Sequence, residues 1–136
     1  MLALKPDQLP VTAEPSIYTT AAAALERVNP RAAQTAYASA LQHWPDDRAA
    51  LFGSGNTAYA LGQREAAAKA YRHAVKRHPD FADGWNNLAQ VLLELNHRKE
   101  ASQAIAHAVL LGGERLPAYQ ALQQDIYKKS ASSPFK

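Results

Sequence analysis

The residues WNNLAQVLLELNHRKEASQAIAHAVLLGG at 85–113 decide the fold, because 51–79, LFGSGNTAYALGQREAAAKAYRHAVKRHP, shows the same pattern 34 positions earlier. A third, weaker copy lies upstream. Small and large side chains recur at matching places in all copies: Ala33, Ala67 and Ala101; Tyr37, Tyr71 and Ile105; Ala40, Ala74 and Ala108. An earlier stripe in each copy begins at Ile17, Leu51 and Trp85. Two apolar stripes per unit at helical spacing predict a pair of packed helices in each copy.

This unit resembles the tetratricopeptide repeat, which has a large apolar residue at position 4, small residues at positions 8, 20 and 27, a large one at 24 and proline at 32. Three units numbered from Glu14, Arg48 and Ala82 meet most of these positions. The small residues allow two helices to approach closely, and position 24 fills the space beside them. The resemblance covers about residues 14–115. It implies an all-α fold, a right-handed α-solenoid of three repeats.

The same register organises the rest of the chain. Repeats are predicted at 14–47, 48–81 and 82–115, with a capping helix at 116–129, a flexible tail at 130–136 and an extended, proline-containing segment at 1–13. Within the repeats, helices are predicted at 15–28, 30–43, 47–61, 63–77, 81–95 and 97–111. Gly62 and Asn96 occupy equivalent turn positions, where a left-handed backbone favours glycine or asparagine. Trp85, at position 4, is predicted to lie in the core.

Composition narrows the class of protein. The chain of 136 residues is 47% hydrophobic and 20% charged, which suits a globular protein. It has no cysteine, which excludes disulfides and thiolate metal sites. The net charge of +3 is low for a dedicated nucleic-acid binder, and no aromatic residues alternate with the basic ones for base stacking, so nucleic acid is disfavoured. No apolar run reaches the roughly 20 residues that span a bilayer, so no membrane insertion is expected.

Motifs for catalysis and metal binding are not found. The five histidines include no pair three or four residues apart, as a helical metal site would need. The stretch Gly53-Ser54-Gly55 lacks the Lys-Ser/Thr of a phosphate loop, and Gly55 is the small position 8 of a helix. No serine lies in a nucleophile elbow. The sequence therefore predicts no enzyme, with no catalytic residue, metal or cofactor.

A peptide-binding groove is the predicted functional site. In the tetratricopeptide family, positions 2, 5, 6, 9, 12 and 13 line the concave surface. Here these positions hold a candidate groove of aromatic, amide and acidic residues: Tyr18, Phe52, Asn56, Tyr59, Asp83, Asn86, Asn87, Gln90 and Glu94, together with Glu26. Amide side chains both donate and accept, so they suit the backbone of an extended peptide. An interaction module that binds an extended or helical protein segment is therefore the predicted function.

The groove positions also predict the charge of the ligand. Family members that bind acidic chaperone C-termini use a clamp of lysine, asparagine and arginine, but Tyr18 and Phe52 stand where position 5 would supply lysine. No lysine or arginine occupies these positions in the three repeats. The ligand is therefore predicted to be neutral or basic rather than an acidic C-terminus.

Two alternatives remain open. The string LKPDQLPVTAEP, with AALERVNP, resembles the region that follows a C39-like cysteine peptidase domain in some bacterial proteins, which implies an accessory domain presenting substrates or partners. The apolar residues of 1–13 also allow self-assembly, in which this segment fills the groove or repeat end of another copy. Neither alternative determines the cellular compartment. The sequence as given suits a soluble protein, either in the cytoplasm or, as part of a longer exported chain, in the bacterial envelope.

Overall fold

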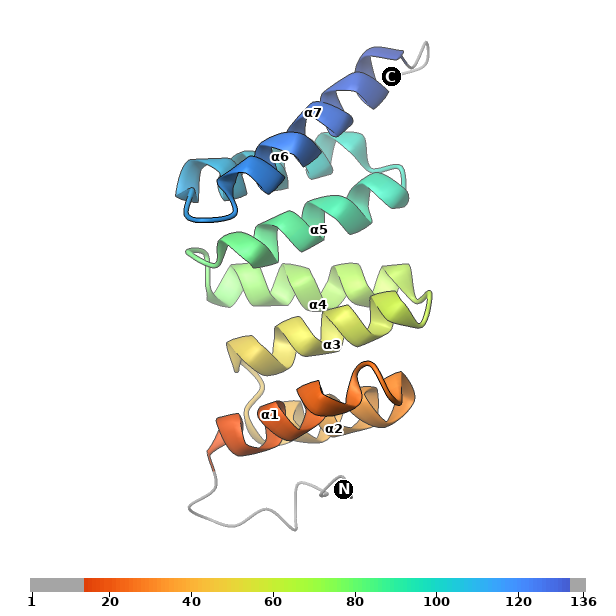
Figure 1. The fold of residues 1–136 in the computed structure, drawn as a ribbon, viewed down its shortest axis with the longest axis vertical. Helices are drawn as coiled ribbons and strands as arrows, with labels where there is room; N and C mark the ends of the chain where they lie inside the picture. The colour runs from red at the N-terminus through yellow and green to blue at the C-terminus, as the bar shows by residue number, and fades with distance from the viewer. Residues whose placement is uncertain (1–13, 133–136) are drawn as a thin grey trace.

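The computed structural model describes residues 14–132. Over this range the chain forms seven α-helices and no β-strand: α1 Pro15–Leu25, α2 Pro30–His43, α3 Arg48–Ala60, α4 Arg64–Arg77, α5 Ala82–Glu94, α6 Arg98–Leu111 and α7 Leu116–Ser132. The first helices of the pairs, together with α7, lie one above another and run in the same direction, with the second helices behind or between them (Figure 1). The predicted all-α helical repeat is confirmed.

Short polar side chains and prolines begin several of these helices. Asn29 accepts a hydrogen bond from the backbone N–H of Ala32 at 3.1 Å, and Pro30 follows as the first helical residue. Asp47 accepts from the N–H of Ala50 at 2.9 Å to begin α3. These contacts satisfy backbone donors that have no partner in the first helical turn.

The observed helix ends lie within one residue of the predicted ones, except at the ends of α1 and α7, which differ by three residues. Gly62 and Asn96 both adopt the left-handed conformation, at φ 77° and 68°. The first helix ends at Leu25 rather than at 28, because the chain tightens into turns there: the backbone N–H groups of Glu26 and Val28 bond the carbonyls three residues earlier, at 3.2 and 3.1 Å. The last helix continues to Ser132, so residues 130–132 are helical and not part of a tail.

The core forms where position 24 meets the small residues. Tyr37, Tyr71 and Ile105 are all at most 2% exposed. A Cβ atom added at Gly55 would lie 2.4 Å from the Tyr71 ring, which confirms that this glycine is needed for close packing. Trp85 differs from the prediction, because it is only half-buried: its ring packs against the core and stacks on His107 at 4.1 Å between centroids.

The predicted extended segment 1–13 lies outside the described residues, as does 133–136 of the predicted tail. None of the described helices combines the length and apolar character needed to cross a bilayer. The part of the chain that the structure describes thus presents a single stack of helices, with the candidate residues on its first helices.

Candidate functional site: a groove across the first helices

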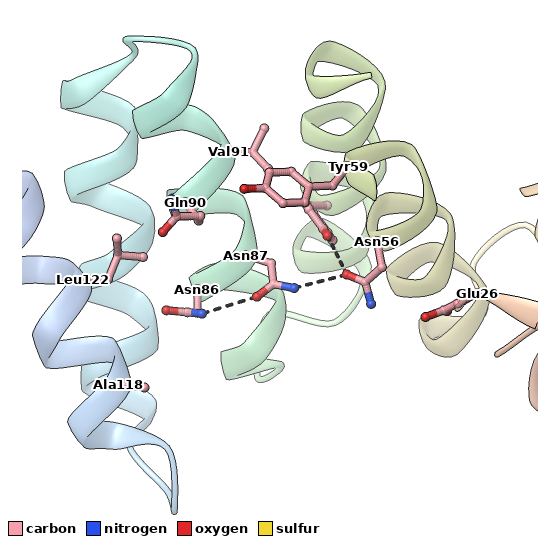
Figure 2. Close-up of a pocket in the computed structure, with 10 residues that line it drawn as sticks. Glu26, Asn56, Tyr59, Asn86, Asn87, Gln90, Val91, Ala118 and Leu122 are labelled. Atoms are coloured by element: carbon pink, nitrogen blue, oxygen red, sulfur yellow. Dashed lines mark hydrogen bonds between the residues drawn. The ribbon is translucent and has the colours of Figure 1, made fainter. Parts of the chain in front are cut away.

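A groove of about 470 Å³ crosses the face formed by α3, α5 and α7 and extends to Glu26, which follows the end of α1. Figure 2 shows the side chains that line it, which are amide, aromatic, acidic and apolar: Glu26, Asn56, Tyr59, Tyr71, Asn86, Asn87, Gln90, Val91, Ala118 and Leu122. Five of these were predicted as candidate groove residues, and Glu26 was named beside them. The repeat register thus brings residues from separate repeats together on one surface.

A chain of amides runs along the groove. Asn86 donates to Oδ1 of Asn87 at 3.3 Å, and Asn87 donates to Oδ1 of Asn56 at 3.2 Å, so the row joins α5 to α3 (Figure 2). The hydroxyl of Tyr71 donates to the same Asn56 oxygen at 2.5 Å. These bonds fix the orientation of each amide while using only part of its donors and acceptors. The groove therefore holds a pre-oriented set of groups that suit a peptide backbone.

Two tyrosines of the second helices bring their hydroxyls to this face. Burial raises the pKa of Tyr71 to about 12. Burial, with the hydrogen bond to Glu26, raises the pKa of Tyr37 still further; its hydroxyl donates to Glu26 at 2.5 Å. Both phenols are therefore neutral donors at physiological pH.

The acidic residues of the groove each have a donor partner. Glu94 accepts from the hydroxyl of Tyr59 at 2.6 Å, from Gln90 at 2.8 Å and from Nε of Arg64 at 2.8 Å. Burial alone would raise the pKa of Glu94, but the donors from Tyr59, Arg64 and Gln90 bring it below its usual value. Arg64 belongs to α4, so a cation from a second helix reaches the edge of the groove, which the groove positions alone did not predict.

Asp83 has a similar arrangement nearer to α7. It accepts from the hydroxyl of Tyr119 at 2.6 Å, and Arg115 lies 3.6 Å away. Burial, with this hydrogen bond, raises the pKa of Tyr119 to about 12. Asp83 therefore holds α7 against α5.

Four predicted residues lie outside the lining. Tyr18 packs against Trp44, with 5.6 Å between ring centroids, and Phe52 packs against Tyr71 and Phe81. Both rings are half-buried against neighbouring helices, and Phe52 supports the groove because its partner Tyr71 is one of the lining residues. Asp83 and Glu94 are the other two predicted residues, and both lie beside the groove, where they accept the hydrogen bonds described above.

The prediction also missed four lining residues: Tyr71, Val91, Ala118 and Leu122. A signal existed for Tyr71, because a phenol at position 24 is long enough to pass between first helices and carries a hydroxyl that needs a partner. For Ala118 and Leu122, the sequence predicted that the helix covers the last repeat, but it did not show that these two side chains reach the groove.

The described residues show no group of three or more metal-ligating side chains. On the α4 side, His73 lies 2.9 Å from the Asp46 carboxylate, and His78 bonds the Asp46 backbone oxygen at 2.7 Å. These contacts join the turn after α2 to the next repeat, which is a structural use of the histidines.

Comparison with known proteins gives a family and several similar folds. A model of the tetratricopeptide repeat matches residues 24–86 and 58–126. A search of curated proteins gave no match. Among solved structures, the first tetratricopeptide domain of Spaghetti (RPAP3), bound to the HSP90 peptide SRMEEVD, is 11% identical with a TM-score of 0.81, covering 90% of this chain and all of that one.

Two structures of the protein MamA are also similar. Each is 14% identical; the TM-scores are 0.68 and 0.69, with 87% and 88% of this chain covered and 70% and 82% of theirs. At these identities the likeness shows the fold alone. The family match spans most of the chain, over the same helices that carry the groove. The chain therefore belongs to the tetratricopeptide repeat family.

Proposed function

We propose that this protein is an interaction module that binds an extended protein segment in the groove, through backbone hydrogen bonds to the amide row and apolar contact with Tyr59. Tetratricopeptide domains are protein-interaction modules and are generally non-catalytic scaffolds. The observation that carries the proposal is the oriented row of Asn86, Asn87 and Asn56, which reaches across two repeats. Such a row recognises a main chain whatever its side chains.

The charge of the groove favours a neutral or basic ligand. Its lining includes Glu26, and Glu94 and Asp83 lie beside it, whereas no lysine or arginine is in the lining. Arg64 and Arg115 approach the groove, but each is paired with one of those carboxylates. The similar Spaghetti domain binds the acidic peptide SRMEEVD, and we expect that peptide not to bind here.

The test begins with a probe selected on the chain itself. A random dodecapeptide library is panned on the 136-residue protein, and the tightest peptide is synthesised for calorimetry. Replacing both Tyr59 and Asn87 by alanine should weaken the binding of this peptide by at least about tenfold, because a few residues contribute most of the binding energy of an interface. The matched control replaces Gln103 and Leu110 by alanine, since both are exposed on α6 away from the groove.

Three outcomes decide the proposal. A selected peptide that the Tyr59/Asn87 variant loses and the control retains supports the groove. Equal binding by both variants, with unchanged helicity by circular dichroism, rejects the groove as the site. Binding of synthetic SRMEEVD as tight as that of the selected peptide overturns the predicted charge preference.

The self-assembly hypothesis rests on residues 1–13, and the accessory-domain hypothesis rests on LKPDQLPVTAEP together with AALERVNP at 23–30. The string LKPDQLPVTAEP and the segment 1–13 lie almost wholly outside the described residues. None of the matches above concerns a peptidase. Both hypotheses stay predictions, and neither changes the residues proposed for the groove.

A further inference from the structure

Among the described residues that line the groove, Glu26 is the only carboxylate, and it differs from the acidic residues beside the groove. Glu94 is paired with Arg64 at 2.8 Å, and Asp83 is paired with Arg115 at 3.6 Å. No lysine, arginine or histidine in the described part of the chain lies within 4.0 Å of the Glu26 carboxylate. Glu26 therefore brings a negative charge to the groove that no described cation balances.

The repeat register gives the reason for this difference. Glu26 and Glu94 both stand at position 13 of their repeats. The partners of Glu94, which are Tyr59 and Arg64, come from the preceding repeat, 35 and 30 residues earlier in the chain. No described repeat precedes the first one, so no described residue supplies these two contacts to Glu26. The same position is thus paired in the third repeat and open in the first.

The Glu26 carboxylate is held in place without being neutralised. Its Oε1 accepts a hydrogen bond from the hydroxyl of Tyr37 at 2.5 Å, and this hydroxyl is a neutral donor. Its Oε2 has no hydrogen-bond partner among the described residues. Since a carboxylate has about four acceptor sites, most of them are available to a ligand. The side chain is half-buried, so salt screens a pair formed there less than it screens an exposed pair.

This open carboxylate lies at the end of the amide row. Figure 2 shows Glu26 beyond Asn56, on the side of the groove away from α7. The Oδ1 atom of Asn56 accepts from Tyr71 and Asn87, whereas its amide nitrogen donates to no described residue. Neighbouring helices are roughly 8–10 Å apart, and an extended chain advances about 3.3 Å per residue. A peptide bound to the row therefore brings a side chain to Glu26 within about three residues of Asn56.

We infer that Glu26 is a specificity-determining residue that binds a lysine or arginine side chain of the peptide, an inference that rests on the proposed function. The cation pairs with Oε2 while the Tyr37 hydroxyl keeps Oε1, and it takes the role that Arg64 has beside Glu94. Removing a cation from water costs free energy, which a carboxylate compensates and a neutral groove does not. The ligand is then an extended segment with a basic residue at one end and neutral residues along the amide row.

The first experiment uses the dodecapeptide selected on the wild-type chain, as above, which should contain at least one lysine or arginine. Glu26→Gln removes the charge but keeps an oxygen that accepts from Tyr37, so the fold should remain, as circular dichroism checks. This substitution should weaken peptide binding about fivefold at low salt and less at high salt. Glu65→Gln is the matched control, because it makes the same change in net charge at an exposed position of α4.

A second measurement changes the peptide, so it does not depend on the fold of a variant. Each lysine or arginine of the peptide is replaced in turn by norleucine, which has no charge. One replacement should weaken binding to the wild-type protein about fivefold. The same replacement should cause no further loss with the Glu26→Gln protein, because both changes remove one ion pair.

The outcomes separate this inference from the proposed function. A loss with Glu26→Gln that Glu65→Gln does not share, and that disappears with the norleucine peptide, supports the inference. Where binding depends on Tyr59 and Asn87, other results overturn the inference and leave the groove standing. They are a selected peptide without lysine or arginine, equal binding by the two glutamine variants, norleucine replacements without effect, and additive losses. Binding that is indifferent to Tyr59 and Asn87 overturns both.

Discussion

The two contacts between successive repeats are built differently, although the same tyrosine position supplies both. Between the first and second repeats, the Tyr37 ring lies against the backbone of Gly53, where an added Cβ would be 2.1 Å from the ring. Between the second and third repeats, Asn87 occupies the place equivalent to Gly53, and it shares the Asn56 oxygen with Tyr71. We call these the glycine joint and the amide joint.

The difference shows how packing and binding compete at one position. At the glycine joint the ring takes the space, so position 6 has no side chain to offer a ligand. At the amide joint the tyrosine hydroxyl and the asparagine side chain meet, which leaves an amide on the groove surface. The groove is therefore built mainly around the amide joint.

The largest expected effect is a loss of stability caused by Gly53→Ala at the glycine joint. Alanine normally stabilises a helix by up to about 1 kcal/mol relative to glycine. At Gly53 we expect the opposite, a loss of about 2 kcal/mol of unfolding free energy, because the added methyl group overlaps the buried Tyr37 ring. Chemical denaturation measures the loss.

A double-mutant cycle tests the cause. If the clash with the ring is responsible, Gly53→Ala combined with Tyr37→Leu should cost less than the sum of the single substitutions. Additive costs would show that the glycine is needed for another reason, and the distinction between the two joints would then fail.

Much of the fold could be predicted from the sequence, because the repeat period fixes which residues share a face. The turn positions Gly62 and Asn96 were correct for this reason, as was the close approach at Gly55. The end of α1 was not, since residues 26–28 form turns with bonds to carbonyls three residues earlier, which the helical periodicity does not reveal.

The groove was less predictable, because the repeat register gives the face of the helix on which a residue lies but not how deeply its side chain is buried. Tyr18 and Phe52 stand at groove positions, yet their rings find neighbours inside the stack and pack there. Tyr71 was assigned to the core, and its ring is buried as expected, but its hydroxyl extends to the groove. Long amphipathic side chains belong to two environments at once, which a pattern of small and large residues does not encode.

A smaller effect distinguishes the two joints, because the tyrosine hydroxyl donates to a charged acceptor at one and to a neutral acceptor at the other. The Tyr37 hydroxyl donates to the carboxylate of Glu26, whereas that of Tyr71 donates to the amide of Asn56. Bonds to charged groups contribute more, so we expect Tyr37→Phe to cost about 1.5 kcal/mol and Tyr71→Phe about 1 kcal/mol. Unfolding at neutral pH measures both, with Tyr127→Phe as the exposed control. Equal costs, or a larger cost for Tyr71→Phe, would contradict this ranking.

The smallest effect concerns the edge of the amide joint, where Glu94 of the third repeat bonds Tyr59 and Arg64 of the second. Although burial opposes it, these donors lower the pKa of Glu94 in the folded protein. The stability that Glu94 contributes is therefore complete above its unfolded pKa of about 4.3, and it is lost as the pH falls through the folded value. Because the ion pair is partly exposed, we expect at most about 0.5 kcal/mol.

Thermal unfolding between about pH 6 and pH 3 measures this contribution. Wild type should lose slightly more stability on acidification than Glu94→Gln, which has no carboxylate to protonate, while Glu65→Gln on the exposed side of α4 should follow wild type. Parallel curves for wild type and Glu94→Gln would mean that the ion pair adds nothing. The amide joint would then depend on Tyr71, Asn56 and Asn87 alone.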